Sequence, residues 1–275
     1  RSDCAPDVAL KLLRTMQQLY LAGENSAGPN TIVYSSVSSC WAKCGRNDAP
    51  EAALKLLRTM QQQYLAGDKS SRPNSITYST VISAVGRAGK AEKAEALLEE
   101  LYSDYLKGNN SAKPDVVSFS TVLNAWSKSN SLDSPERAEG ILERMAQLHS
   151  SGALDVKPDT ICYTSVINCW AKSGRKDAPD AAKKLLRTMQ QQYLADESSR
   201  PNAITYNTVI NAFARAGQAD RAEALLEEMH SDYLDGNDSA KPNVRSFNPV
   251  LDSWSKLRSR DSSQRAEAIL ERMVQ

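Results

Sequence analysis

Six basic side chains recur at nearly even intervals along the chain and could contact a regularly spaced polyanion. Neighbouring members of this row are 41 to 44 residues apart. A single solvated Lys or Arg carries no information, but one cation per interval suits a ladder of phosphates. A stripe of solvated charge is the alternative interpretation. The six cations are Lys43, Arg87, Lys128, Lys172, Arg215 and Lys256.

A second row stands eleven residues before the cations and is apolar in five of its six positions. Eleven residues correspond to three helical turns, so in a helix both rows lie on nearly the same face. A branched apolar side chain at this position would otherwise be exposed on the first turn. The row consists of Ile32, Ile76, Val117, Ile161 and Ile204, and its sixth position is Arg245.

Both rows belong to a repeated unit that opens with proline followed by Asn or Asp. Six such openings, 41 to 44 residues apart, predict a stacked array. Asn or Asp just before a helix accepts hydrogen bonds from unpaired first-turn N–H groups, so each first helix is expected to start directly afterwards. The openings are Pro29-Asn30, Pro73-Asn74, Pro114-Asp115, Pro158-Asp159, Pro201-Asn202 and Pro242-Asn243.

Each unit contains a second amphipathic segment, so the unit is a helix pair. Residues 91–108, AEKAEALLEELYSDYLKG, place Ala94, Leu97, Leu98, Leu101 and Tyr105 on one face. The sequence KLLRTMQQQYLA occurs at 55–66 and again at 184–195, an offset of 129 residues that equals three units. The array is therefore a three-unit block present twice, and a feature that every unit needs should recur in all six.

Two rows of large side chains are predicted to form the core, with a ligand platform as the alternative. They lie seven residues apart in the first helices, where residues i and i+7 share a face. The first row is Tyr34, Tyr78, Phe119, Tyr163, Tyr206 and Phe247, and the second is Trp41, Val85, Trp126, Trp170, Phe213 and Trp254.

Neither the composition nor the residue patterns indicate an enzyme or a membrane protein. There are 34 Lys and Arg against 33 Asp and Glu, so the net charge of +1 does not indicate a nucleic-acid or membrane partner. Five cysteines, at 4, 40, 44, 162 and 169, match no disulfide framework. The pair Cys40 and Cys44 has a spacing that could hold a metal on one helix, but its copy is Cys169 and Ser173, which favours packing residues. We expect no metal and no cofactor.

Catalytic groups are scarce as well. The two histidines, His149 and His230, have no recurring partner, and the pairs Glu99-Glu100 and Glu227-Glu228 occupy polar helix faces. No phosphate-binding glycine loop or zinc spacing occurs. No apolar run approaches the roughly 20 residues that span a bilayer, and the first residues lack the regions of a signal peptide.

The units resemble pentatricopeptide repeats along their whole length. The segments ITYSTVISAVGRAGKAEKAEALLEEL (76–101) and ITYNTVINAFARAGQADRAEALLEEM (204–229) are close to that motif, and all six units match in outline. The resemblance implies an all-α, right-handed superhelical solenoid that binds single-stranded RNA, with each repeat reading one base. It also implies that the apolar row packs against base faces and that the cations contact phosphates.

The base-reading residues of such repeats correspond to the residue after the aromatic and to the Asn or Asp after the next linker proline. Short Ser or Thr leaves room for a purine, and Asn fits a pyrimidine better; Asp can only accept a hydrogen bond, whereas Asn donates and accepts. The array is then expected to prefer 5′-AGGA(C/U)(C/U)-3′. The pairs are Ser35 with Asn74, Ser79 with Asp115, Ser120 with Asp159, Thr164 with Asn202, and Asn207 with Asn243, while Asn248 has no partner. Helix capping alone is the competing explanation of the Asn and Asp row.

The sequence thus predicts one array over residues 1–275. It consists of a half repeat at 1–30, full repeats at 31–74, 75–115, 116–159, 160–202 and 203–243, and a truncated repeat at 244–275. Single-stranded RNA is the expected partner, in organellar RNA processing, stabilisation or translation, with a mitochondrial or plastid location implied by the resemblance. No small-molecule substrate is expected. A protein-interaction scaffold is the alternative. These repeats are longer than is usual for the family, which puts the spacing of one base per repeat in question.

Overall fold

The computed structural model describes residues 5–24, 27–194, 197–257 and 260–274, and Cys4 lies outside these ranges. In the described residues all regular structure is helical, and a short 3₁₀ helix follows each of α3, α5, α9 and α11. No helix there is long and apolar enough to cross a membrane. Residues 1–129 with 147–156 form one compact unit, and residues 130–146 with 157–275 form the other.

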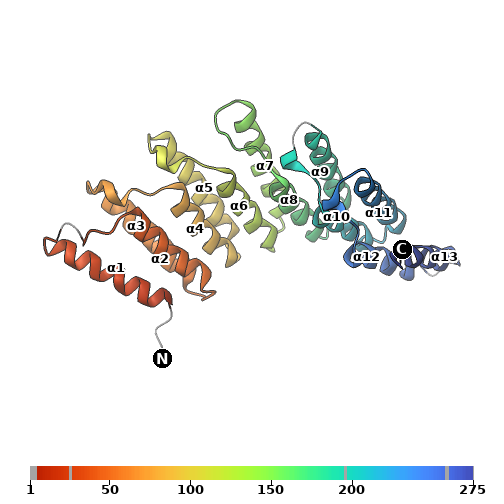
Figure 1. The fold of residues 1–275 in the computed structure, drawn as a ribbon, viewed down its shortest axis with the longest axis horizontal. Coiled ribbons are helices and arrows are strands. Elements are labelled where there is room, and N and C mark those ends of the chain that lie inside the picture. The colour runs from red at the N-terminus through yellow and green to blue at the C-terminus, as the bar shows by residue number, and fades with distance from the viewer. Residues whose placement is uncertain (1–4, 25–26, 195–196, 258–259, 275) are drawn as a thin grey trace. The chain divides into compact units, whose positions relative to one another are not determined.

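The first unit contains helix pairs in chain order (Figure 1). First helices contact the next first helix, as α2 contacts α4 and α4 contacts α6, and each second helix contacts the following first helix. The bounds are α1 Ala5–Leu21, α2 Thr31–Lys43, α3 Ala49–Leu65, η2 Lys69–Ser71, α4 Ser75–Arg87, α5 Ala91–Leu106, η3 Asn110–Ala112 and α6 Val116–Lys128.

The second unit repeats this order. Helices α8, α10 and α12 contact one another in sequence, and α9 and α11 each contact the first helix that follows. Helix α7 has residues in both units. The bounds are α7 Ser134–Ser150, α8 Thr160–Lys172, α9 Ala178–Tyr193, η4 Glu197–Ser199, α10 Ala203–Arg215, α11 Ala219–Leu234, η5 Asp238–Ala240, α12 Val244–Lys256 and α13 Arg260–Val274. The expectation of an all-α array of tandem helix pairs is confirmed.

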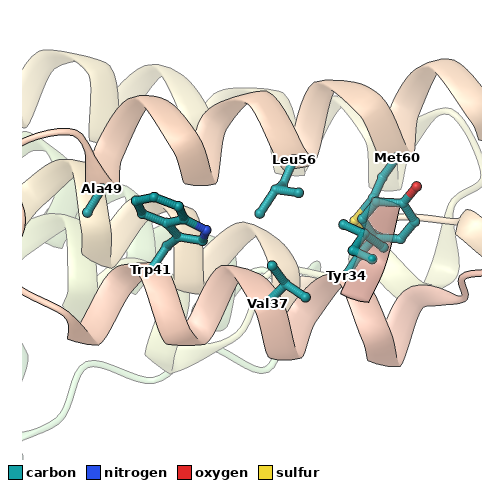
Figure 2. Packing of buried hydrophobic residues seen from close by; sticks show 7 residues of the cluster. Tyr34, Val37, Trp41, Ala49, Leu56 and Met60 are labelled. Carbon is teal, nitrogen blue, oxygen red and sulfur yellow. The ribbon is translucent and has the colours of Figure 1, made fainter. Parts of the chain in front are cut away.

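The two rows of large side chains form the core, as the sequence predicts. Figure 2 shows Tyr34, Val37 and Trp41 of α2 facing Leu56 and Met60 of α3. The other members of both rows are buried too, except Phe247, which is only partly buried. Burying side chains of this size contributes about 1.5–3 kcal/mol each, so these rows hold the helix pairs together.

Buried indole nitrogens need hydrogen-bond partners, and three of them bond to glutamates that the sequence pattern did not predict. The indole N–H of Trp170 donates to Glu139 at 3.1 Å, and those of Trp126 and Trp254 donate to Glu95 and Glu223 at 3.0 Å. Each glutamate precedes its tryptophan by 31 residues. The same offset from Trp41 reaches Leu10, and the indole nitrogen of Trp41 is buried without a hydrogen-bond partner in the described part of the chain.

Candidate nucleic-acid interface

The apolar row lies at the surface of the first helices. Its five members are 59–74% exposed, although they stand one or two residues from fully buried positions on the same turn. One exposed isoleucine is ordinary, but five at equivalent sites expose the same apolar edge in every full repeat. They are Ile32 in α2, Ile76 in α4, Val117 in α6, Ile161 in α8 and Ile204 in α10.

The six cations lie at the opposite ends of the same helices, and all are exposed. Each is the last residue of its first helix, where a positive charge also interacts favourably with the helix dipole. Arg87 and Lys256 also bond to the protein itself. The Arg87 guanidinium donates to the Ala42 carbonyl of the preceding repeat at 2.9 Å, and the Lys256 ammonium lies 2.6 Å from the Asp252 carboxylate.

The Asn and Asp residues of the linkers are helix caps. In the pairs expected to read bases, their Oδ1 accepts from a first-turn N–H at 2.8–3.0 Å. These residues therefore cap the first helices. The bond engages Oδ1, so an Asn side chain still has its Nδ2 donor and an Asp side chain still has Oδ2 as an acceptor. Capping and base reading are compatible for Asn74, Asp115, Asp159, Asn202 and Asn243.

Three of the five expected pairs are joined by a third side chain. A hydroxyl on the next first helix contacts the Ser or Thr of the pair and also donates to the cap residue. Ser35 lies 2.9 Å from Thr77, Ser79 lies 3.0 Å from Ser118, and Thr164 lies 2.8 Å from Thr205, with each distance measured between hydroxyl oxygens. The structure thus brings Ser35 to Asn74, Ser79 to Asp115 and Thr164 to Asn202.

The remaining two pairs differ. The Ser120 hydroxyl donates to the Val117 carbonyl at 3.2 Å, and the residue equivalent to the bridging hydroxyl is Cys162. In the last pair, the Ser246 hydroxyl accepts from the Asn243 backbone N–H at 3.0 Å instead of bridging to Asn207. The side-chain oxygen of Asn207 is buried without a partner in the described residues.

A groove in the second unit gathers residues from all three predicted rows. Its volume is about 510 Å³, and α8, α10 and α12 supply most of its wall. An open groove with an apolar edge, cations and amides can bind a planar, polar and anionic ligand. Predicted site residues in its wall are Lys172, Ile204, Asn207, Arg215, Asn243 and Asn248.

The groove wall also contains Asn168 and Asn211, which are not among the site residues predicted from the sequence. They stand four residues after the base-reading positions, one turn further along the same helix face. The equivalent residues are polar in all six repeats, and this recurrence was the available signal. The row is Ser39, Ser83, Asn124, Asn168, Asn211 and Asp252.

Two segments of the chain match the family model described as "PPR repeat". They are residues 69–101, which cover η2, α4 and most of α5, and residues 197–230, which cover η4, α10 and most of α11. The chain contains pentatricopeptide repeats. The resemblance noted in the sequence is thereby confirmed.

Solved pentatricopeptide repeat structures share this fold. The protein PPR10 in complex with an 18-nt psaJ RNA element matches with a TM-score of 0.54 at 21% identity. A triple cysteine-to-serine variant of PPR10 with the same RNA element matches equally. The match covers 97% of this chain and 36% of PPR10, so the chain spans about a third of the length of that protein. No curated protein sequence matches the chain at a significant level.

The cysteines described here lie at a helix end or pack inside the array. Cys44, expected on the same helix as Cys40, follows the last residue of α2, and its thiol donates to the Trp41 carbonyl at 3.0 Å. Ser173 makes the equivalent bond to Trp170 at 2.8 Å, which explains why serine replaces cysteine in the copy. Burial raises the pKa of the Cys169 thiol to about 12, so this side chain stays protonated.

The histidines and glutamate pairs of the array are occupied by local contacts. His149 lies 3.7 Å from Asp155, and His230 is exposed beside Tyr233. Glu100 and Glu228 each bind an arginine of the preceding second helix, Arg58 and Arg187 respectively. These carboxylates therefore link repeats.

Proposed function

We propose that the array binds single-stranded RNA along its first helices, with one base per repeat. The observation that carries the proposal is the groove of α8, α10 and α12, where Ile204, Asn207, Asn243 and Arg215 share one wall. An apolar side chain can stack on a base, amides can read its edge and a cation can neutralise phosphate. PPR10, which has the same fold, was solved with RNA bound.

The base-reading pairs predict which RNA sequence the array binds. Ser with Asn favours adenine, Ser with Asp favours guanine, and Asn with Asn favours a pyrimidine, which yields 5′-AGGA(C/U)(C/U)-3′. The caps support this reading because each keeps one polar atom beyond its capping bond. The biological role would be processing, stabilisation or translation of an organellar transcript in a mitochondrion or plastid, as is common in the family.

Fluorescence anisotropy with labelled RNA tests the function. The purified chain is titrated with RNA containing AGGACU, with a scrambled RNA and with the DNA equivalent, across a salt series. We expect tight binding of the first RNA, weaker binding of the other two, and an affinity that falls as salt rises. Equal binding of the AGGACU and scrambled RNAs would refute base reading, and no binding at low salt would refute RNA binding.

A protein-interaction scaffold is the second candidate, favoured by a different surface. Leucines at the ends of the second helices are 66–86% exposed, and they recur in both units. Recurring exposed leucines are typical of surfaces that contact other proteins. If no nucleic acid binds, this surface becomes the first to test by co-purification. The residues are Leu21, Leu65, Leu106, Leu194 and Leu234.

A further inference from the structure

Three buried hydroxyls lie between the proposed base-reading residues of successive repeats. Thr77, Ser118 and Thr205 are each 0% exposed, although they stand on the first turns of α4, α6 and α10 next to the exposed apolar row. Each donates to the Oδ1 of its own cap residue, at 2.8, 2.7 and 3.1 Å respectively. Each also contacts the Ser or Thr hydroxyl of the preceding repeat. We call these three residues the bridging hydroxyls.

The direction of the bonds is fixed where the cap is an aspartate. A carboxylate only accepts, so the Ser118 O–H must donate to Asp115. A hydroxyl has one hydrogen, and therefore the 3.0 Å contact between Ser79 and Ser118 requires Ser79 to donate. The Ser79 hydrogen then points at Ser118, so Ser79 can only accept hydrogen bonds from any other partner, such as an RNA base. The Oδ2 of Asp115 is likewise an acceptor.

We infer that Ser118 is a positioning residue that makes Ser79 and Asp115 present only hydrogen-bond acceptors to the RNA base. The inference rests on the proposed function and explains how the pair selects guanine. Guanine is the one standard base with two adjacent donors, N1–H and N2–H₂, on its Watson–Crick edge. Adenine offers an acceptor at N1, which would face an acceptor. Thr77 and Thr205 act in the same way on Ser35 and Thr164.

The Asn caps show how the same bridge can serve a different base. The Thr77 hydroxyl and backbone N–H both donate to one side-chain oxygen of Asn74, at 2.8 and 2.9 Å. This arrangement orients the amide so that Nδ2 is its remaining group. Ser35 with Asn74 therefore presents one acceptor and one donor, and a base with two adjacent donors no longer fits. Because the bridging hydroxyl holds both side chains in place, exchanging Asn for Asp at the cap changes which base the pair can bind.

The chain contains a natural comparison, because one Ser and Asp pair has no bridging hydroxyl. The residue equivalent to Ser118 is Cys162, whose sulfur lies 3.8 Å from the sulfur of Met145. Asp159 accepts from the Cys162 backbone N–H at 2.9 Å, and Ser120 donates to the Val117 carbonyl. Ser120 therefore also presents only lone pairs, but Asp159 has no side-chain hydroxyl like Ser118 to hold its Oδ1 in the described residues. Because Asp159 is held by one bond where Asp115 is held by two, we expect guanine to be preferred more strongly at the second base than at the third.

The test measures base preference at single positions by anisotropy. The unmodified chain is titrated with AGGACU RNA and with variants that have adenine or inosine at the second or third base. Inosine lacks the N2 amino group and so removes one donor. We expect either replacement to weaken binding about tenfold at the second base and about threefold at the third. Equal losses at both positions would overturn the inference.

Substitutions at the bridge separate its role from simple stability. Ser118→Ala should reduce the preference for guanine over adenine at the second base about fivefold and leave the third base unaffected. Ser118→Thr keeps a hydroxyl, as Thr77 and Thr205 do, and should retain the preference. Ser127→Ala is the matched control, because Ser127 is also buried in α6 and donates to the Asn124 carbonyl at 2.9 Å.

The outcomes distinguish this inference from the proposed function. An unmodified chain that binds RNA without any preference at the second base would overturn both. A chain that prefers guanine, with the same preference in Ser118→Ala, would overturn the positioning role alone. If Ser118→Ala fails to fold by circular dichroism, Ser79→Ala replaces it, since Ser79 is only partly buried. That variant loses one of the two acceptors, and an unchanged preference for guanine would overturn the inference.

Discussion

The side-chain amide of Asn109 donates a hydrogen bond of 3.0 Å to the carbonyl oxygen of Pro73. Asn109 precedes η3, in the loop that makes these repeats long, and Pro73 belongs to the preceding linker. The copy in the second unit has the same contact, and serines act in its place in other repeats. In four repeats the added residues therefore join the loop to the linker one repeat earlier. The other contacts are Asn237 to Pro201, Ser71 to Pro29 and Ser199 to Pro158.

Removing this contact should destabilise the array. Asn109 is 7% exposed, so Asn109→Ala leaves the buried Pro73 carbonyl without its donor. We expect the free energy of unfolding to fall by about 1–3 kcal/mol, measured by urea denaturation. Asn110→Ala, in the exposed neighbouring position, should change it by less than about 0.5 kcal/mol. Equal effects of the two substitutions would show that the contact contributes nothing.

Exchanging the cap residue of the first pair should change the base that it reads. Asn74→Asp keeps the Oδ1 that caps α4 and replaces the Nδ2 donor with an acceptor. The preference at the first base should shift from adenine toward guanine by about 1–3 kcal/mol, measured by anisotropy with single-base RNA variants. Asn110→Asp adds the same charge outside the site and should leave base preference unchanged. A constant preference in Asn74→Asp would contradict the assignment.

Removing a cation of the phosphate row should weaken every RNA alike. Lys128 is exposed at the end of α6, where it is proposed to contact phosphate. Lys128→Ala should lower the affinity for matched and scrambled RNA by the same factor and reduce the salt slope by about 1. Lys113→Ala, which removes an exposed cation from a loop, is the control. A loss restricted to one base would show that Lys128 reads sequence.

The ion pair between second helices should contribute stability that depends on pH. Burial raises the pKa of Glu100, but bonds from Arg58, Gln61 and Tyr78 outweigh that effect and hold the pKa below its ordinary value of 4.5. Arg58→Ala should therefore cost about 1 kcal/mol at pH 7, a modest amount because Arg58 is half exposed.

The sign of the pH dependence follows from the lowered pKa. The contribution of the pair is complete above pH 4.5 and is lost as the pH falls through the lower folded value. Denaturation of Arg58→Ala and the unmodified chain should thus converge in acid. Lys55→Ala removes an exposed cation of α3 and controls for net charge. A stability difference that stays constant down to pH 3 would contradict the role of Glu100.

The amino-acid sequence by itself determined the helices and the core of this protein. Asn74 and the other caps are local signals, because the cap oxygen and the N–H that it bonds are three residues apart. The spacing of Tyr34 and Trp41 likewise specifies one helix face, and both side chains are buried. Such features depend on the helical period alone, which the sequence displays directly.

The tertiary structure decided how side chains of different repeats meet. Ser35 and Thr77 are 42 residues apart, and Asn109 and Pro73 are 36 residues apart, so no helical period relates the members of either pair. Their contacts depend on how far each helix slides along its neighbour when side chains of the two pack together. The sequence could predict that Ser35 and Asn74 act as a pair by resemblance. Only the packed first helices place the buried Thr77 hydroxyl between them.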